Sequence, residues 1–268
     1  MAFFQADTMA SLTPERVKEY WEWRRRYSIH ALNRERTEVE IIERGATDGT
    51  IIRELAGALR PAIRHAIEQR RLVPGEYYIP VPSAPRGRDY WITRDEAARL
   101  LWEARRDWRA RLYLPLYVMI GLYTGARRGA ILDLTWRQID LVRSRVDFNP
   151  PGRNETAKRR PHIPVPRPLL AALRRAHGRA SSPYVIAYQG RRLASVKRAF
   201  NAAAARAGIP DCTSHTLRHT AGTWMAQRGV SMREIGGYLG HSEARTTELY
   251  AHHHPDYMRA ARAAFERA

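Results

Sequence analysis

The sequence has a single cysteine, Cys212, among 268 residues. One thiol cannot build a disulfide framework or a cysteine-rich metal site, so both are excluded. Long hydrophobic runs are missing as well, because the most apolar stretch, residues 112–123, is too short to cross a bilayer and contains Pro115. The first ten residues lack a positive segment followed by a long apolar run, so no signal peptide is expected. These absences favour a protein of the reducing cytoplasm.

Acidic residues are few: 27 aspartates and glutamates stand against 46 lysines and arginines, a formal net charge of +19. This balance favours a polyanionic partner, most commonly nucleic acid. A solubility surface, a ribosomal protein and a membrane-surface protein are the other interpretations, and no amphipathic basic anchor supports the last. Lysine is also scarce, with only Lys18, Lys158 and Lys197. A role that needs a titratable amine therefore has three candidates.

Proline and glycine divide the chain. Residues 74–88 contain six of them, which excludes a long regular element and predicts an extended linker. We therefore expect two domains, residues 1–87 with the linker and residues 88–268. In the first, Thr13 and Pro14 predict the start of a helix that reaches Tyr27. Apolar residues at helical spacing predict a second helix over residues 50–67, which Pro61 should kink or split.

The second domain is predicted to be mostly helical. A capping box at residues 93–96 opens a helix that reaches Arg106. Further helices are expected over 112–123, 128–134, 168–177, 195–207, 216–228, 232–239, 243–251 and 256–266. Short strands are expected at 146–148 and 162–165, around a turn, with a third at 184–186. The predicted fold class is mainly α with a small antiparallel β-sheet (α+β).

Three motifs spread over more than a hundred residues fit one phosphodiester site. They are TGAR at 124–127, HTLR at 215–218, and LGH at 239–241 followed nine residues later by Tyr250. Arginine presents a planar fork of donors that matches phosphate oxygens, and a tyrosine oxygen can attack phosphorus. Each motif alone has a plainer interpretation. Gly125 is typical of a helix C-cap beside a surface arginine, and a His-x-x-Arg pair arises by chance in so basic a chain.

The motifs and their order resemble those of the tyrosine recombinase (phage integrase) family, over roughly residues 90–256. The resemblance implies a site-specific recombinase that cleaves and rejoins double-stranded DNA through a 3′-phosphotyrosyl intermediate, for integration or excision of a phage or other mobile element. In it, Tyr250 attacks phosphorus and a lysine protonates the departing 5′-oxygen, while two arginines and two histidines hold the phosphate. The implied catalytic residues are Arg127, Lys158, His215, Arg218, His241 and Tyr250.

Some assignments within this set need a choice. Arg127 fits the register of the first motif better than its neighbour Arg128. Lys158 is the only lysine near the turn between the predicted strands, although counting back from residues 163–164 would put the family's lysine at Thr156. An amine can release a proton there, whereas a guanidinium effectively cannot. Ala130 departs from the family, which usually has an acid at that position that helps to orient the site.

Two other histidine groups are set aside. His219 is a packing residue in the family. The run at residues 252–254 does not predict a metal site, because consecutive residues do not easily converge on one ion and no carboxylate or cysteine cluster supports them. The reaction implied by the resemblance uses neither a metal nor a cofactor, and no Walker-type phosphate loop occurs in the sequence.

The resemblance also implies partners. Double-stranded DNA is the substrate, bound by a homotetramer at synapsis that is monomeric when free, with accessory DNA-bending or directionality proteins as further candidates. Residues 1–87 would be a shortened helical clamp domain and residues 88–268 the catalytic domain, in a cytoplasmic, nucleoid-associated protein. A type IB topoisomerase remains an alternative. So does an inactive DNA-binding regulator, which Ala130 and the short N-terminal region would suit.

Overall fold

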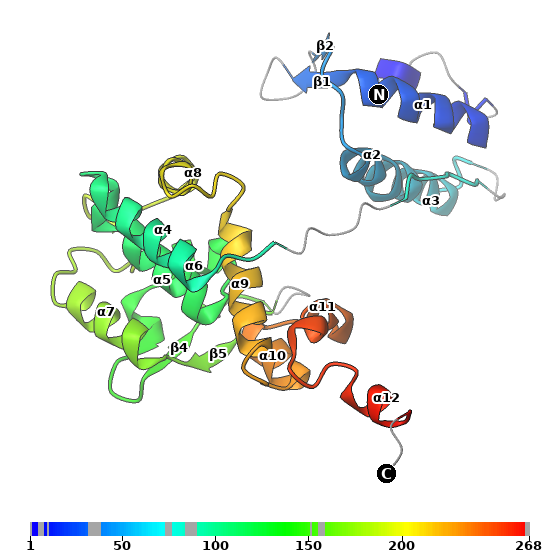
Figure 1. Ribbon diagram of the computed structural model, residues 1–268. Coiled ribbons are helices and arrows are strands. Elements are labelled where there is room, and N and C mark those ends of the chain that lie inside the picture. The colour runs from blue at the N-terminus through cyan, green and yellow to red at the C-terminus, as the bar shows by residue number, and fades with distance from the viewer. Residues whose placement is uncertain are drawn as a thin grey trace. The chain divides into compact units, whose positions relative to one another are not determined.

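A computed structural model describes residues 2–4, 8–9, 11–31, 39–72, 77–83, 90–150, 152–154 and 159–265. The chain divides into two compact units, Met1–Arg88 and Asp89–Ala268 (Figure 1). Helices dominate the described part of both units, and the strands are short and antiparallel. The predicted class, mainly α with small antiparallel sheets, is confirmed. Lys158 lies outside the described residues.

The first unit begins with a short 3-10 turn and a capped helix. After η1 (Ala2–Phe4), helix α1 (Pro14–Arg26) starts where predicted, because Thr13 Oγ1 accepts a hydrogen bond from the Arg16 amide at 3.2 Å. A hairpin of β1 (Ser28–Ala31) and β2 (Val39–Ile42) follows, which the sequence pattern does not predict. Each strand has only four residues, too few for a period-two pattern to stand out.

The second helical pattern of this unit is one continuous run rather than a split pair. Helix α2 (Asp48–Glu54) passes through a π-helical turn, η2 (Leu55–Leu59), into α3 (Arg60–Glu68). The amide of Arg60 bonds the carbonyl of Leu55, five residues back. This wider turn accommodates the Pro61 ring, which would otherwise clash with the preceding turn, so the expected split does not occur. The core of the unit comprises Val17, Tyr20, Ile51, Leu55, Ile63 and Ile79.

In the second unit, helices α5 and α9 pack against each other at the centre (Figure 1). Helix α5 carries apolar residues on all of its faces, as expected of a helix that the rest of the unit surrounds, and most of them are buried. The helices are α4 (Arg94–Arg106), α5 (Leu114–Thr124), α6 (Arg128–Asp133), α7 (Arg167–His177), α8 (Lys197–Arg206), α9 (Ser214–Ala226), α10 (Met232–Leu239), α11 (Ala244–Glu248) and α12 (Arg259–Ala263). Short 3-10 turns are η3 (Ala110–Leu112), η4 (Trp136–Gln138) and η5 (Ala251–His253). Among the described helices, none combines the length and apolar character needed to span a membrane.

The strands of this unit correct one prediction. A three-stranded sheet runs β3 (Ile139–Asp140), β4 (Arg145–Asp147), β5 (His162–Pro164), and a separate hairpin pairs β6 (Ala187–Tyr188) with β7 (Arg191–Arg192). The prediction of a strand at residues 184–186 is wrong, since Tyr184 makes only an isolated bridge to Thr135. Val185 and Ile186 are buried in the helical core, which explains their apolar run.

The C-terminal helices are shorter than predicted. The helix expected over 243–251 ends at Glu248, and the one expected over 256–266 covers only residues 259–263. Tyr250 therefore lies in the short link between α11 and η5. This link turns the tyrosine back toward α9.

Candidate active site

Arg127 is brought into the site by a left-handed glycine. Gly125 ends α5 with φ 61°, and a side chain there would collide with Leu239. After this turn Arg127 is the N-cap residue of α6. Arg127 is half-buried, while Arg128 is exposed. The Arg127 guanidinium donates hydrogen bonds to the carbonyl oxygens of Arg159 at 2.7 Å and of Gly240 at 3.4 Å.

Arg218 is held from the opposite side by α9. Its side chain is buried, and Nη1 donates to the carbonyl oxygens of Gly125 and Leu239, both at 2.8 Å. Nη2 is also buried but has no hydrogen-bond partner among the described residues. A buried donor without an acceptor is costly, and it costs more when it carries charge.

The electrostatics of the two arginines suit an anionic ligand. Burial, with the nearby Arg127, lowers the pKa of Arg218 to about 10, and burial with Arg153 and Arg160 lowers the pKa of Arg127. Within the part of the chain that the structure describes, no carboxylate pairs with either guanidinium. Two neighbouring guanidinium groups, one with a buried Nη2 that has no acceptor among the described residues, suit a phosphate group.

Tyr250 lies directly against helix α9. It is 3% exposed, and its ring packs on Gly222, where an added Cβ would come 2.5 Å from the ring carbon that bears the hydroxyl. The phenol oxygen is 3.4 Å from Nδ1 of His219. On the other side the ring lies nearly parallel to that of His241, with 6.3 Å between centroids. Only a glycine at position 222 leaves room for this placement.

The two predicted histidines differ in their surroundings. His241 follows the left-handed Gly240, and its Nδ1 is 2.7 Å from Oγ1 of the buried Thr247. Burial and then the two arginines lower the pKa of His241 to about 4, so the ring is neutral at pH 7. His215 is more exposed, and its ring packs edge-on against that of His219, with 4.5 Å between the ring centroids. Desolvation, followed by His219 and the arginines, lowers its pKa as well.

Five of the six predicted residues therefore gather in one place: Arg127, His215, Arg218, His241 and Tyr250. Lys158 cannot be placed, because it is outside the described residues. No group of three or more histidine, cysteine or acidic side chains that could hold a metal occurs in the described ranges.

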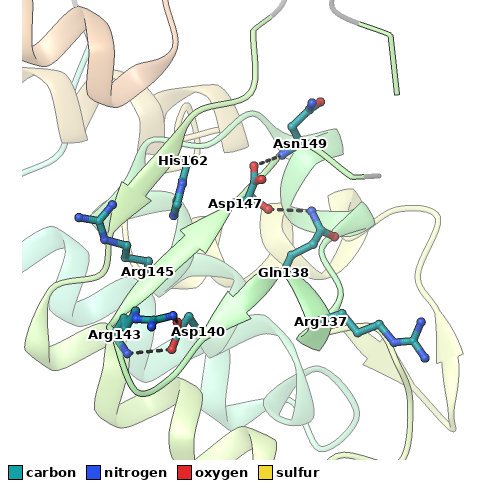
Figure 2. A pocket seen from close by; sticks show the side chains of 8 residues that line it. All are labelled: Arg137, Gln138, Asp140, Arg143, Arg145, Asp147, Asn149 and His162. Carbon is teal, nitrogen blue, oxygen red and sulfur yellow. Dashed lines mark hydrogen bonds and ion pairs between the residues drawn. The ribbon is translucent and has the colours of Figure 1, made fainter. Parts of the chain in front are cut away.

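A basic hollow lies beside this cluster, and a second one adjoins it. A cavity of about 300 Å³ is lined by His241, Gly240 and three arginines, Arg153, Arg159 and Arg160. A larger one of about 530 Å³ lies on the outer face of the β3-β4-β5 sheet, where Arg137, Arg143 and Arg145 project around Asp140 and Asp147 (Figure 2). Asn149 and His162 line both. A largely basic hollow therefore leads from the site across the sheet.

A sequence profile described as the phage integrase family matches residues 90–256. The chain belongs to the phage integrase family. This family member is 28% identical over 219 residues to the integrase of Salmonella phage P22, covering 75% of this chain and 53% of that protein. It is 27% identical over 179 residues to the tyrosine recombinase XerA of Pyrococcus furiosus, covering 63% of this chain and 59% of XerA. The chain thus spans just over half the length of these two relatives.

Solved structures agree on the fold of this integrase-family chain. The Tn1549 transposon integrase, in complex with transposon right end DNA, matches with a TM-score of 0.71 and 17% identity, over 97% of this chain and 86% of that one. A crystal structure of XerA recombinase matches with a TM-score of 0.55 and 22% identity, over 83% of this chain and 85% of that one.

Sequence reasoning missed two residues of this integrase-family site. His219, expected only to pack, lies within hydrogen-bond distance of the Tyr250 oxygen, and Gly222 receives the Tyr250 ring. Both follow the HTLR motif at helical spacing, at four and seven residues after His215. These spacings place them on the same face of α9 as His215 and Arg218, and that periodicity was the signal that could have found them.

Proposed function

We propose that this protein is a site-specific DNA recombinase that cleaves and rejoins double-stranded DNA through a 3′-phosphotyrosyl intermediate. The observation that carries the proposal is the buried Nη2 of Arg218, which has no partner among the described residues, in a cluster with Arg127 and Tyr250. A phosphodiester would supply an acceptor oxygen to this Nη2 and negative charge beside the two guanidinium groups. The phage and transposon integrases among the relatives support integration or excision of a mobile element as the task.

The proposed reaction is a transesterification, in which the phosphate passes from the 5′-oxygen of DNA to the tyrosine oxygen. The Tyr250 oxygen gives its proton to solvent and attacks phosphorus, the bond from phosphorus to the 5′-oxygen breaks, and that oxygen takes up a proton from a general acid. Arg127 and Arg218 bind the non-bridging oxygens and stabilise the charge that builds on them. The neutral His241 and His215 complete the pocket. The 5′-hydroxyl of a partner strand then reverses the step, so the phosphate bond is conserved.

We propose double-stranded DNA as the partner, held in part by the basic hollow of Figure 2. Residues 88–268 would form the catalytic domain and residues 1–87 a helical clamp domain. XerH, another structural relative, was solved on its difH substrate, which supports this choice of ligand. A homotetramer at synapsis is also part of the proposal, and the exposed Leu249, Met258 and Phe265 offer apolar surface for neighbouring protomers. We also propose accessory DNA-bending or directionality proteins as partners, and association with the nucleoid.

Covalent trapping tests the proposal. Duplexes that bind the full chain are selected from a randomised pool, and a set of nicked versions is made with the nick stepped along the selected site. A nick just beyond the cleavage point lets the freed strand diffuse away, so the intermediate should accumulate as a protein–DNA adduct stable in denaturing gels. A protein that binds these duplexes tightly yet yields no adduct from any of them would be a DNA-binding regulator instead.

Lys158 is proposed as the general acid, on the resemblance and on its being the sole lysine of that segment. Lys158→Ala should slow cleavage by about 10²- to 10⁴-fold, the usual contribution of a general acid. A 5′-thio leaving group departs without much protonation, so a duplex with 5′-sulfur at the scissile position should restore most of the rate. Single-turnover adduct formation measures both, with Lys197→Ala as the matched control. Equal slowing on both duplexes would leave Lys158 as a phosphate contact only.

A further inference from the structure

Helix α6 carries its acidic residue in an unusual place. Ala130, one turn into the helix, is buried at 4% exposure and offers no polar group. Asp133 is the last residue of the same helix and is half-buried. Its Oδ2 accepts from Nη2 of Arg160 at 2.9 Å, and its Oδ1 accepts from Arg192.

Arg160 connects this carboxylate to the site through the backbone. The carbonyl of its neighbour Arg159 accepts the 2.7 Å hydrogen bond from Arg127. Pro161, on the other side, packs so closely on Gly240 that an added Cβ there would come 2.8 Å from its ring. Gly240 supplies the second carbonyl that binds Arg127. The orientation of the Arg127 guanidinium therefore depends on where residues 159–161 lie.

Charge gives the same pair a second role. Arg160 is only 17% exposed in its side chain, and its charge is one of the causes that lower the pKa of Arg127. Partial burial alone would raise the pKa of Asp133, but the hydrogen bonds from Arg160 and Arg192 outweigh it and lower that pKa. Asp133 is therefore ionised at neutral pH and balances the charge of Arg160. Without that balance, Arg160 would repel Arg127 more strongly.

We propose that Asp133 is a positioning residue for strand cleavage: by holding Arg160, it fixes residues 159–161 and so aims Arg127 at the scissile phosphate. This inference rests on the proposed function. In this chain the orienting carboxylate stands three residues later than Ala130 and acts through an arginine.

The test compares two carboxylate variants of the full chain on the selected nicked duplex. Asp133→Asn removes the charge that holds Arg160. Glu103→Gln is the matched control, because Glu103 also pairs with two arginines, Arg206 at 2.9 Å and Arg106 at 3.1 Å. Adduct formation by Asp133→Asn under single turnover should fall about 10- to 100-fold, the scale of a small misplacement at a reacting centre. Glu103→Gln should keep the unaltered rate, and both variants should keep the duplex affinity.

A scissile methylphosphonate separates positioning from a general structural loss. It lacks one charged non-bridging oxygen, so cleavage depends less on Arg127, and Asp133→Asn should recover most of its deficit on it. Arg192→Gln breaks the other contact of the same carboxylate and should leave the rate unchanged. An equal loss in Arg192→Gln, or an undiminished deficit on the methylphosphonate, would overturn the inference.

A double-mutant cycle covers the case in which Asp133→Asn folds poorly. Arg160→Gln should lose rate by itself, and adding Asp133→Asn to it should cost little more, because both act through one contact. Additive losses would overturn the inference. Failure of the proposed function would look different, since the unaltered protein would then form no adduct at all.

Discussion

Tyr250→Phe should form no covalent adduct with any nicked duplex while binding the same DNA with nearly unaltered affinity. The change removes one oxygen and keeps the ring that packs on Gly222 and beside His241. It also removes the long hydrogen bond, at 3.4 Å, between the phenol oxygen and Nδ1 of His219. A hydrogen bond of this kind stabilises the fold by about 1 kcal/mol. The fold and the phosphate pocket should therefore survive without a nucleophile.

Tyr257→Phe is the matched control for that experiment. Tyr257 lies seven residues later and is 48% exposed, so the loss of its hydroxyl should leave adduct formation intact. Denaturing gels and a binding titration on the same duplex give both readouts. An adduct that persists in Tyr250→Phe and disappears in Tyr257→Phe would reassign the nucleophile.

Gly222→Ala should lose adduct formation by about a hundredfold, as expected when a reacting group is displaced by about 1 Å. The new Cβ would lie 2.5 to 2.8 Å from three carbons of the Tyr250 ring. The helix backbone cannot yield easily, so the ring must move away from the phosphate pocket. The same change favours helix α9 by about 1 kcal/mol, because alanine is the better helix former.

These opposite effects give Gly222→Ala a recognisable signature, in which activity falls without a matching loss of stability. Gly57→Ala is the control, since Gly57 also lies inside a helical run but has open space where its Cβ would be. Thermal unfolding and single-turnover trapping should be measured on both. A Gly222→Ala protein with unaltered trapping would mean that Tyr250 is not held against α9 during the reaction.

The sequence predicted the helical class and the caps because those signals are local. Thr13 and Thr93 accept the N-terminal amides as expected, and Gly125 takes the left-handed conformation that ends α5. The strand prediction at residues 184–186 was wrong because a short apolar run occurs both in buried strands and in buried loops. Of the two outcomes expected at Pro61, a kink or a split, the split does not occur, because a π-turn accommodates the proline, and no sequence signal predicts that turn.

The residues that gather at the candidate site could be named from motifs, but the residues that support them could not. Arg127, Arg218 and Tyr250 could be proposed from motifs because their residue types suit a phosphate. The role of Gly222 follows only from its contact with the Tyr250 ring. The role of Asp133 follows only from its ion pair with Arg160, which adjoins the backbone that binds Arg127. Such contacts join segments far apart in the chain, so a single sequence read along its length does not contain them.

The central claim is that Tyr250 becomes covalently joined to the 3′-phosphate of the cleaved strand. The most direct test is mass spectrometry of the trapped adduct after nuclease and protease digestion, which locates the modified residue and identifies the attached nucleotide. We predict a single modified peptide, with Tyr250 bearing a nucleotide linked through its 3′-phosphate. A nucleotide on any other residue, or a linkage through a 5′-phosphate, would contradict the account.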